Sequence, residues 1–305
     1  MTPAEYEDRL SALVKGTKGS QQSLLRLADR EIAHGQEMCA WRGYVALSNA
    51  FKAFFLTSVS RFDDEIRPVA SQSSTEQYIL FIERIVHGFQ ALRSAEVVSL
   101  SGYPLQGLTI LRNVYDECVL TSGVMQGYSD FVRLEGSVSG QPYDMNLAKK
   151  NRMKEELVVR KKMDGSNSGL SDQTINLLRK LGGIYDLEVH GGRISKLTTI
   201  GWIKGTEPLK VAPEFSELKA GMFVNRFCEV GWMIHRLLPL IQPQHQTFEK
   251  DWGDGWKVID DSFEIIVASL TKSLGKPIGQ AFCEFVKLKF PFDSKSQHPI
   301  FHAAP

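Results

Sequence analysis

The sequence lacks the short motifs that mark the best-known enzyme classes. It contains no GxxxxGK[ST] phosphate loop, no GxGxxG turn, no HExxH and no GxSxG. These motifs place phosphates, dinucleotides, zinc or a nucleophilic serine in a defined geometry. A nucleotide-binding, metalloprotease or serine hydrolase function is therefore not indicated. No side chains at metal-ligand spacing stand out either, and we expect no cofactor.

Cysteine is scarce, and charge of neither sign dominates. Cys39, Cys118, Cys228 and Cys283 lie far apart and form no CxxC pair, which excludes a zinc knuckle and a disulfide framework and favours buried free thiols. Lys and Arg together number 36, against 35 Asp and Glu. The overall charge therefore favours neither nucleic acid nor an acidic partner.

Long hydrophobic runs are also missing. Residues 1–16 are polar and charged, unlike a secretory signal. The most apolar stretch, residues 43–60, contains Ser48, Asn49 and Lys52 and falls short of a membrane-spanning helix. We expect a soluble, cytoplasmic protein with no membrane partner.

Helical periodicity is what the sequence has in abundance. Apolar residues recur at helical spacing along most of the chain. The expected helices cover approximately residues 2–16, 20–35, 37–62, 75–100, 105–125, 147–163, 171–181, 215–240, 258–274 and 277–288. Residues 196–211 are the only good strand candidate. The pattern predicts one domain over residues 1–305, a mainly α multi-helix bundle with one small irregular or β-hairpin insertion.

The segment 105–125 is the most informative, because it is apolar all around its axis yet carries three charges. Arg112 and Asp116 fall on one apolar stripe as an i, i+4 pair, and Glu117 points to another side. A buried Arg can hold a phosphate or carboxylate, and a buried carboxylate suits acid–base chemistry. The alternative is structural: Arg112 pairs with Asp116, and Glu117 caps a neighbouring element.

His190 is the second candidate. It precedes Gly191-Gly192-Arg193 at an expected helix end, where a histidine can titrate near neutral pH. A protonated histidine at a helix C-terminus is also favourable for electrostatic reasons alone. Both a catalytic and a structural interpretation therefore stay open.

The helix of residues 147–163 is the third candidate, with seven basic residues against two Glu. The basic residues are Lys149, Lys150, Arg152, Lys154, Arg160, Lys161 and Lys162. Such a helix can follow a nucleic-acid backbone, although stacking aromatics are sparse there. The alternative is an ordinary solvated surface helix.

Two further features have simpler explanations. His235 lies on an apolar helix and is expected to be a satisfied core residue. Trp252 and Trp256, in the sequence DWGDGW, either form an aromatic lid or, more simply, anchor a loop to the core.

Two segments together resemble a known family. They are Gly102-Tyr103-Pro104-Leu105-Gln106-Gly107-Leu108, continuing to Leu111-Arg112 and Glu117, and the later Ile184-Tyr185-Asp186-Leu187-Glu188-Val189-His190-Gly191. This pairing is similar to that of uncharacterised bacterial helical proteins with a HEPN-like domain, and it covers approximately residues 75–240. The resemblance implies a HEPN-like bundle of four to five helices, a homodimer, and a role in a defence, toxin–antitoxin or stress system.

HEPN ribonucleases use an Arg and a nearby His at the dimer interface to cleave RNA, and this sequence departs from their spacing. Here Arg112 and His190 could converge only through tertiary folding. One hypothesis is an RNA-directed role, in which Arg112 clamps a phosphate, His190 is the general acid–base, Asp116 or Glu117 orients them, and the basic helix follows the backbone. The other is a non-catalytic module that senses or binds a partner protein.

Overall fold

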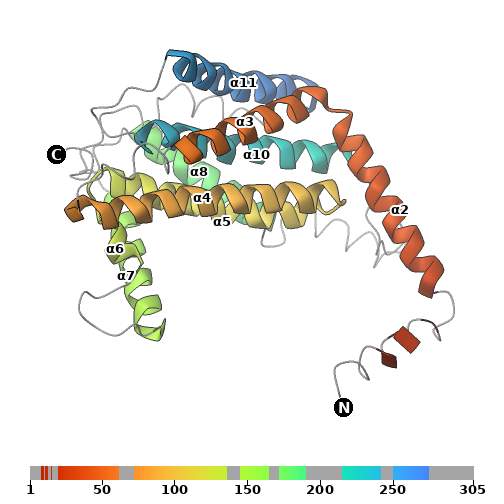
Figure 1. The fold of residues 1–305 in the computed structure, drawn as a ribbon, viewed down its shortest axis with the longest axis horizontal. Helices are drawn as coiled ribbons and strands as arrows, with labels where there is room; N and C mark the ends of the chain where they lie inside the picture. Colours follow the sequence, from red (N-terminus) through yellow and green to blue (C-terminus); the bar gives the residue numbers. More distant parts are fainter. Residues whose placement is uncertain are drawn as a thin grey trace.

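The structure is a computed structural model of the chain that describes residues 20–61, 72–135, 145–164, 172–189, 215–241 and 250–274, with a few isolated positions before residue 20. Within these ranges the chain is helical apart from short turns, as Figure 1 shows. The prediction of a mainly α fold is confirmed there. The strand candidate of residues 196–211, the helix expected at 277–288 and most of the one at 2–16 lie outside the described residues.

Nine α-helices and one short 3-10 helix make up the described part of the chain. They are α2 (Ser20–Cys39), α3 (Arg42–Arg61), α4 (Gln72–Leu100), α5 (Pro104–Met125), α6 (Phe131–Leu134), α7 (Met145–Asp164), α8 (Asp172–Val189), α10 (Glu217–Leu237), η3 (Leu238–Ile241) and α11 (Lys250–Leu274). None of these helices combines the length and apolar character needed to span a membrane.

Helices α4 and α5 form a hairpin at the centre of the bundle. Gly102 takes a left-handed backbone conformation (φ 96°) that ends α4, and Pro104 begins α5 with the dihedral angle a first helical turn requires. Further along α5, a Cβ on Gly107 would lie 2.9 Å from the Phe223 ring and 3.0 Å from the Ala95 carbonyl oxygen. The absence of a side chain at Gly107 therefore lets α4, α5 and α10 approach one another closely.

Aromatic side chains fill the core between α3, α4, α10 and α11. Phe55 of α3 stacks on Phe89 of α4 with ring centroids 4.0 Å apart. Phe51 meets Phe263 of α11 edge to face at 5.5 Å and is fully buried. Aromatic contacts of this kind add to the stabilisation that the burial of the rings already provides.

The helix expected over residues 37–62 is interrupted in the structure. α2 continues to Cys39, and α3 begins at Arg42 after a tight turn in which the Trp41 amide donates to the Met38 carbonyl oxygen at 3.1 Å. The interruption lets α2 extend away from the bundle (Figure 1). Cys39 is exposed at this turn, so the expectation of a buried thiol is wrong there, whereas Cys118 and Cys228 are buried.

The expected loop around Trp252 and Trp256 is also wrong, because both residues lie in the first turns of α11. The two tryptophans nevertheless anchor the segment to the core. The indole N–H of Trp252 donates to Ser58 Oγ at 2.9 Å, and that of Trp256 donates to the His235 carbonyl oxygen at 3.2 Å. Packing of the indoles keeps the segment helical despite its two glycines.

Candidate functional site

Arg112 and Asp116 form the predicted i, i+4 ion pair on α5. They lie at the edge of the bundle rather than in its sealed interior, since 16% and 25% of their side-chain surfaces are exposed. Arg160 of α7 reaches the same carboxylate, with a distance of 2.9 Å from Nη2 to Asp116 Oδ1. Asp116 therefore holds two guanidinium groups together, one from each helix.

Glu117 points to a different side of α5 and connects other helices. It accepts from Arg84 of α4 and from Arg152 of α7, both at 2.5 Å. Arg84 also pairs with Glu135 at 2.6 Å, and Arg152 pairs with Glu156 at 2.8 Å. This network ties α4, α5 and α7 together, so the structural interpretation fits Glu117 better than a catalytic one.

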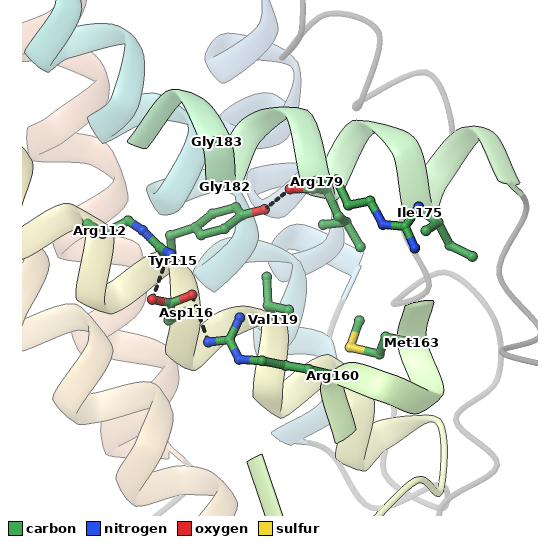
Figure 2. Close-up of a pocket in the computed structure, with 11 residues that line it drawn as sticks. Arg112, Tyr115, Asp116, Val119, Arg160, Met163, Ile175, Arg179, Gly182 and Gly183 are labelled. Atoms are coloured by element: carbon green, nitrogen blue, oxygen red, sulfur yellow. Dashed lines mark hydrogen bonds and ion pairs between the residues drawn. The ribbon is translucent and has the colours of Figure 1, made fainter. Parts of the chain in front are cut away.

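A pocket of about 320 Å³ opens between α5, α7 and α8 (Figure 2). Its lining consists of Arg112, Tyr115, Asp116, Val119, Arg160, Met163, Ile175, Leu178, Arg179, Gly182 and Gly183. The volume is at the lower end of the roughly 300–1,000 Å³ that small-molecule sites occupy. Three guanidiniums, one carboxylate and an apolar wall therefore share one opening.

Tyr115 lines this pocket and is held in place by a hydrogen bond to α8. Its hydroxyl donates to the Leu178 carbonyl oxygen at 2.9 Å and so connects α5 to α8. Burial, with a smaller contribution from the negative charge of Glu229, raises the pKa of Tyr115 well above its usual value. The phenol therefore stays neutral and acts as a fixed hydrogen-bond donor. The Arg112 guanidinium lies 5.7 Å from the centre of the Tyr115 ring, a cation–π distance.

α8 passes over the pocket without interruption at Gly182 and Gly183. The sequence pattern placed one helix end at residue 181 and another at His190, and the end at residue 181 is wrong because α8 is continuous there. α8 continues to Val189. A Cβ built at either glycine meets no described atom within 4 Å. The helix backbone at these positions therefore contributes no side chain to the pocket lining.

The basic residues of α7 fall into two groups. Arg152 and Arg160 are partly buried and turn toward α5, where Glu117 and Asp116 bind them. The exposed lysines are Lys149, Lys150, Lys154, Lys161 and Lys162, of which Lys162 also donates to the Tyr128 carbonyl oxygen at 2.8 Å. The exposed side of α7 is not purely cationic, because Met153 and Leu157 lie among the lysines.

His190 lies outside the described residues, one position beyond the end of α8 at Val189. A shared site of Arg112 and His190 stays a prediction for this reason. α8 does bring its Gly182–Gly183 backbone to the same pocket as Arg112.

Sequence reasoning did not include Arg179 among the candidate site residues and placed Arg160 only on an outer cationic surface. Arg179 is four residues from Ile175 and three from Gly182, so the three lie on the same side of α8. That spacing was a usable signal. The meeting of this side with α5 and α7 depends on tertiary packing.

Sequence reasoning also missed the most deeply buried charges, which are not part of the pocket lining. Arg226 pairs with Glu229 on α10 at 2.7 Å, with side-chain exposures of 5% and 0%. His235, on the same helix, is buried as predicted and its Nε2 lies 2.9 Å from the Trp256 carbonyl oxygen. Burial lowers the pKa of His235 to about 3. None of these groups is among the residues that line the pocket.

Among the described residues, no group of three or more His, Cys, Asp or Glu side chains is placed to hold a metal ion. Comparison with known proteins found no match for this chain among protein-family models, curated proteins or solved structures.

Proposed function

We propose that this protein is an RNA-binding, HEPN-like protein of a defence, toxin–antitoxin or stress system, and that the pocket between α5, α7 and α8 holds the RNA backbone. The observation that carries the proposal is the convergence of Arg112, Arg160 and Arg179 on one pocket from three helices. Guanidinium groups bind phosphate oxygens with paired hydrogen bonds, and three around one small opening form a site for a phosphorylated ligand.

Two features of the surroundings support this proposal. α7 contributes Arg160 to the pocket and presents exposed lysines next to it, which favours association with a polyanion. The apolar wall of Val119, Met163 and Ile175 offers contact area for a nucleoside. A free inorganic anion would make no use of that wall.

RNA cleavage is the catalytic extension of the proposal. In it, Arg112 holds the scissile phosphate and His190 transfers protons at the ribose 2′-hydroxyl and at the leaving oxygen. A homodimer follows from the same resemblance. RNA recovered from cells that produce wild-type protein or His190→Ala protein distinguishes binding from cleavage. Altered RNA ends with wild-type protein alone would support catalysis, and identical ends would limit the function to binding.

Binding itself is tested with a fluorescein-labelled single-stranded RNA and the full-length protein. Arg160→Gln is expected to weaken binding about tenfold, because one charge-assisted contact to phosphate contributes roughly 1.5–3 kcal/mol. Asp116 keeps Arg112 as its partner in this variant, so the fold should persist. Lys257→Gln, an exposed change on α11 outside the pocket lining, is the control. No RNA binding by wild-type protein, or equal losses in both variants, would contradict the proposal.

A protein-interaction module is the second candidate, and one observation favours it. Exposed apolar side chains occupy the same side of α7 as the lysines, including Met145 (71% exposed) and Met153 (63% exposed). A protein partner covers such apolar surface better than a phosphate backbone does. Met153→Ser should leave RNA binding unchanged if the pocket is the RNA site.

A further inference from the structure

The exposed side of α7 carries more large apolar side chains than any other described helix exposes. Of the thirteen large apolar side chains that are exposed among the described residues, five belong to this one helix: Met145, Leu147, Met153, Leu157 and Val158. Met153 and Leu157 are 63% and 52% exposed, and their i, i+4 spacing makes them neighbours on the helix surface. Single exposed apolar residues are common, but a concentration of this kind on one helix indicates a surface that another molecule covers.

The same side of α7 carries charge of only one sign. No acidic residue is exposed between residues 145 and 162, and the exposed charged residues are Lys149, Lys150, Lys154, Lys161 and Lys162. The two glutamates of the helix have partners within the protein. Glu155 accepts from Ser129 Oγ at 2.5 Å, and Glu156 accepts from Arg152 at 2.8 Å. The exposed side is therefore strongly cationic in a chain whose formal net charge is only +1.

The lysines lie on both sides of the apolar pair. With about 3.6 residues per turn, Lys149 falls on one side of Met153 and Leu157, and Lys150 and Lys154 fall on the other. A groove of about 440 Å³ follows this part of the helix and is lined by Asn146, Lys149, Lys150, Met153, Lys154 and Leu157. None of these residues lines the pocket between α5, α7 and α8. α7 therefore has a second surface, apolar along its centre and basic along its edges.

Contacts on the inner side hold α7 in a fixed position. Arg152 donates to Glu117 at 2.5 Å and Arg160 donates to Asp116 at 2.9 Å, so both arginines tie α7 to α5. A Cβ on Gly123 of α5 would overlap the side chain of Val159, so the two helices also approach closely. α7 projects from one end of the bundle (Figure 1). A partner therefore meets a helix that is already formed and oriented, which reduces the entropy lost on binding.

We propose that this surface of α7 binds an acidic amphipathic α-helix of a partner protein. An apolar stripe on the partner covers Met153 and Leu157, and carboxylates on either side of that stripe pair with Lys149 and Lys154. The lysine stems add apolar contact while their ammonium groups reach the carboxylates. The inference goes beyond the RNA-binding proposal and does not rest on it, because the two sites have no residue in common.

Three other occupants fit these features less well. A phosphate backbone pairs with the lysines but leaves Met153 and Leu157 in water. Helices that lie in a membrane interface use aromatic anchors, and α7 contains no Phe, Tyr or Trp. The α7 surface of a second copy would bring lysines against lysines, and like charges in contact oppose association.

The probe is a synthetic fluorescein-labelled helical peptide, read by anisotropy with the full-length protein. Leucine recurs in it at positions i, i+4, i+7 and i+11, and glutamate occupies the positions on either side of this stripe. A second peptide of the same composition has its leucines distributed around the helix. The amphipathic peptide is expected to bind about tenfold more tightly than the rearranged one, because only its leucines can cover the apolar pair together.

Matched variants assign the binding to α7. Met153→Ser removes apolar surface and Lys154→Glu reverses a charge, and each is expected to weaken binding of the amphipathic peptide about tenfold. Val258→Ser and Lys272→Glu make the same changes at exposed positions of α11 and should alter binding less than about twofold. All four positions are exposed, so the fold should persist, and thermal unfolding checks this.

The proposal is overturned if the amphipathic peptide does not bind, or if the rearranged peptide binds equally well and Met153→Ser has no effect. Binding to phosphatidylglycerol vesicles without binding to the peptide would overturn it in favour of a membrane. Self-association in sedimentation that Met153→Ser abolishes would overturn it in favour of a second copy.

Single-stranded RNA, tested with the same variants, separates this inference from the proposed function. Loss of peptide binding in Met153→Ser with unchanged RNA binding supports two independent surfaces. Peptide binding by a wild-type protein that binds no RNA supports the α7 surface and removes the proposed function alone.

Discussion

The aromatic core and the α5–α7–α8 junction both contain ion pairs between arginine and a carboxylate, but the two differ in how much solvent reaches them. In the core, Arg226 and Glu229 form a pair that is almost completely hidden from solvent. At the junction, Asp116 binds Arg112 and Arg160 in positions that solvent reaches, at the edge of a pocket. A sealed pair cannot exchange its partner for a ligand, whereas an accessible arginine can. Burial, and not residue type, therefore decides which charges can act on another molecule.

The energetic consequences of the two arrangements differ as well. Breaking a buried pair leaves a charge without compensation and costs roughly 3–5 kcal/mol, whereas a pair that solvent partly reaches costs less, toward the roughly 0–1 kcal/mol of a fully exposed pair. The core should therefore respond strongly to substitution and the junction weakly. Mutations matched between the two regions test this contrast.

The largest difference should come from truncated side chains. Phe51 is completely buried among rings from α3, α4 and α11, so Phe51→Ala is expected to lower the free energy of unfolding by about 4 kcal/mol. Val119→Ala, at the pocket wall, should cost less than about 2 kcal/mol, because it removes two methyl groups next to open space. Urea unfolding measures both values. Equal losses would show that the junction is as tightly packed as the core.

A second pair of variants compares carboxylates. Glu96 lies in the core within reach of Ser48, Tyr44 and Lys52, with Lys52 Nζ at 3.2 Å. Glu96→Gln is expected to cost about 3 kcal/mol, because it removes the negative charge that compensates Lys52 and Arg93 and replaces one acceptor oxygen with an NH2 donor. Glu117→Gln should cost at most about 1 kcal/mol, since its partner Arg84 keeps Glu135. A larger loss for Glu117→Gln in urea unfolding would reverse the contrast.

Sequence patterns predicted the parts of this structure that depend on local chemistry. Helical periodicity identified most helices, and i, i+4 spacing gave the Arg112–Asp116 pair. Glycine was a misleading signal, because Gly182–Gly183 and the DWGDGW segment lie within helices. Sequence spacing contains no information on the contact between Arg160 and Asp116, which are 44 positions apart. The pocket exists only because α8 and α7 pack on one side of α5.

The third prediction uses pH to separate the two regions. Burial lowers the pKa of His235 to about 3 in the folded protein, from a value of about 6.5 when the chain is unfolded. The unfolded state therefore binds a proton that the folded state excludes, and stability is lost as the pH falls below 6.5. The loss is about 1.4 kcal/mol per pH unit.

Unfolding at pH 7.5 and 5.5 measures this effect in wild-type protein and in His235→Gln. The variant should lose at least 1 kcal/mol less than the wild type over this interval, given about 1.4 kcal/mol per pH unit for the histidine. Burial raises the pKa of Glu96, but the hydrogen bond from Ser48 and the charge of Lys52 outweigh it, so the net pKa is lowered. The stabilisation that ionised Glu96 provides is therefore lost only below pH 5.5, and it does not affect the comparison of unfolding at pH 7.5 and 5.5. Identical pH dependence of unfolding in the two proteins would show that His235 is not responsible for the loss of stability at low pH.

The smallest effects should come from two glycines that differ only in their surroundings. Gly231→Ala places a Cβ 3.0 Å from the Phe263 ring, which is fully buried and has little room to move, so a net loss of about 1 kcal/mol is expected. Gly182→Ala meets no described atom within 4 Å and removes a helix-destabilising residue, so a gain of about 0.5–1 kcal/mol is expected. Thermal unfolding of the two variants resolves a difference of this size. If Gly182→Ala is more stable but binds RNA more weakly, Gly182 favours binding at the expense of stability. If Gly182→Ala is less stable, Gly182 is required for packing.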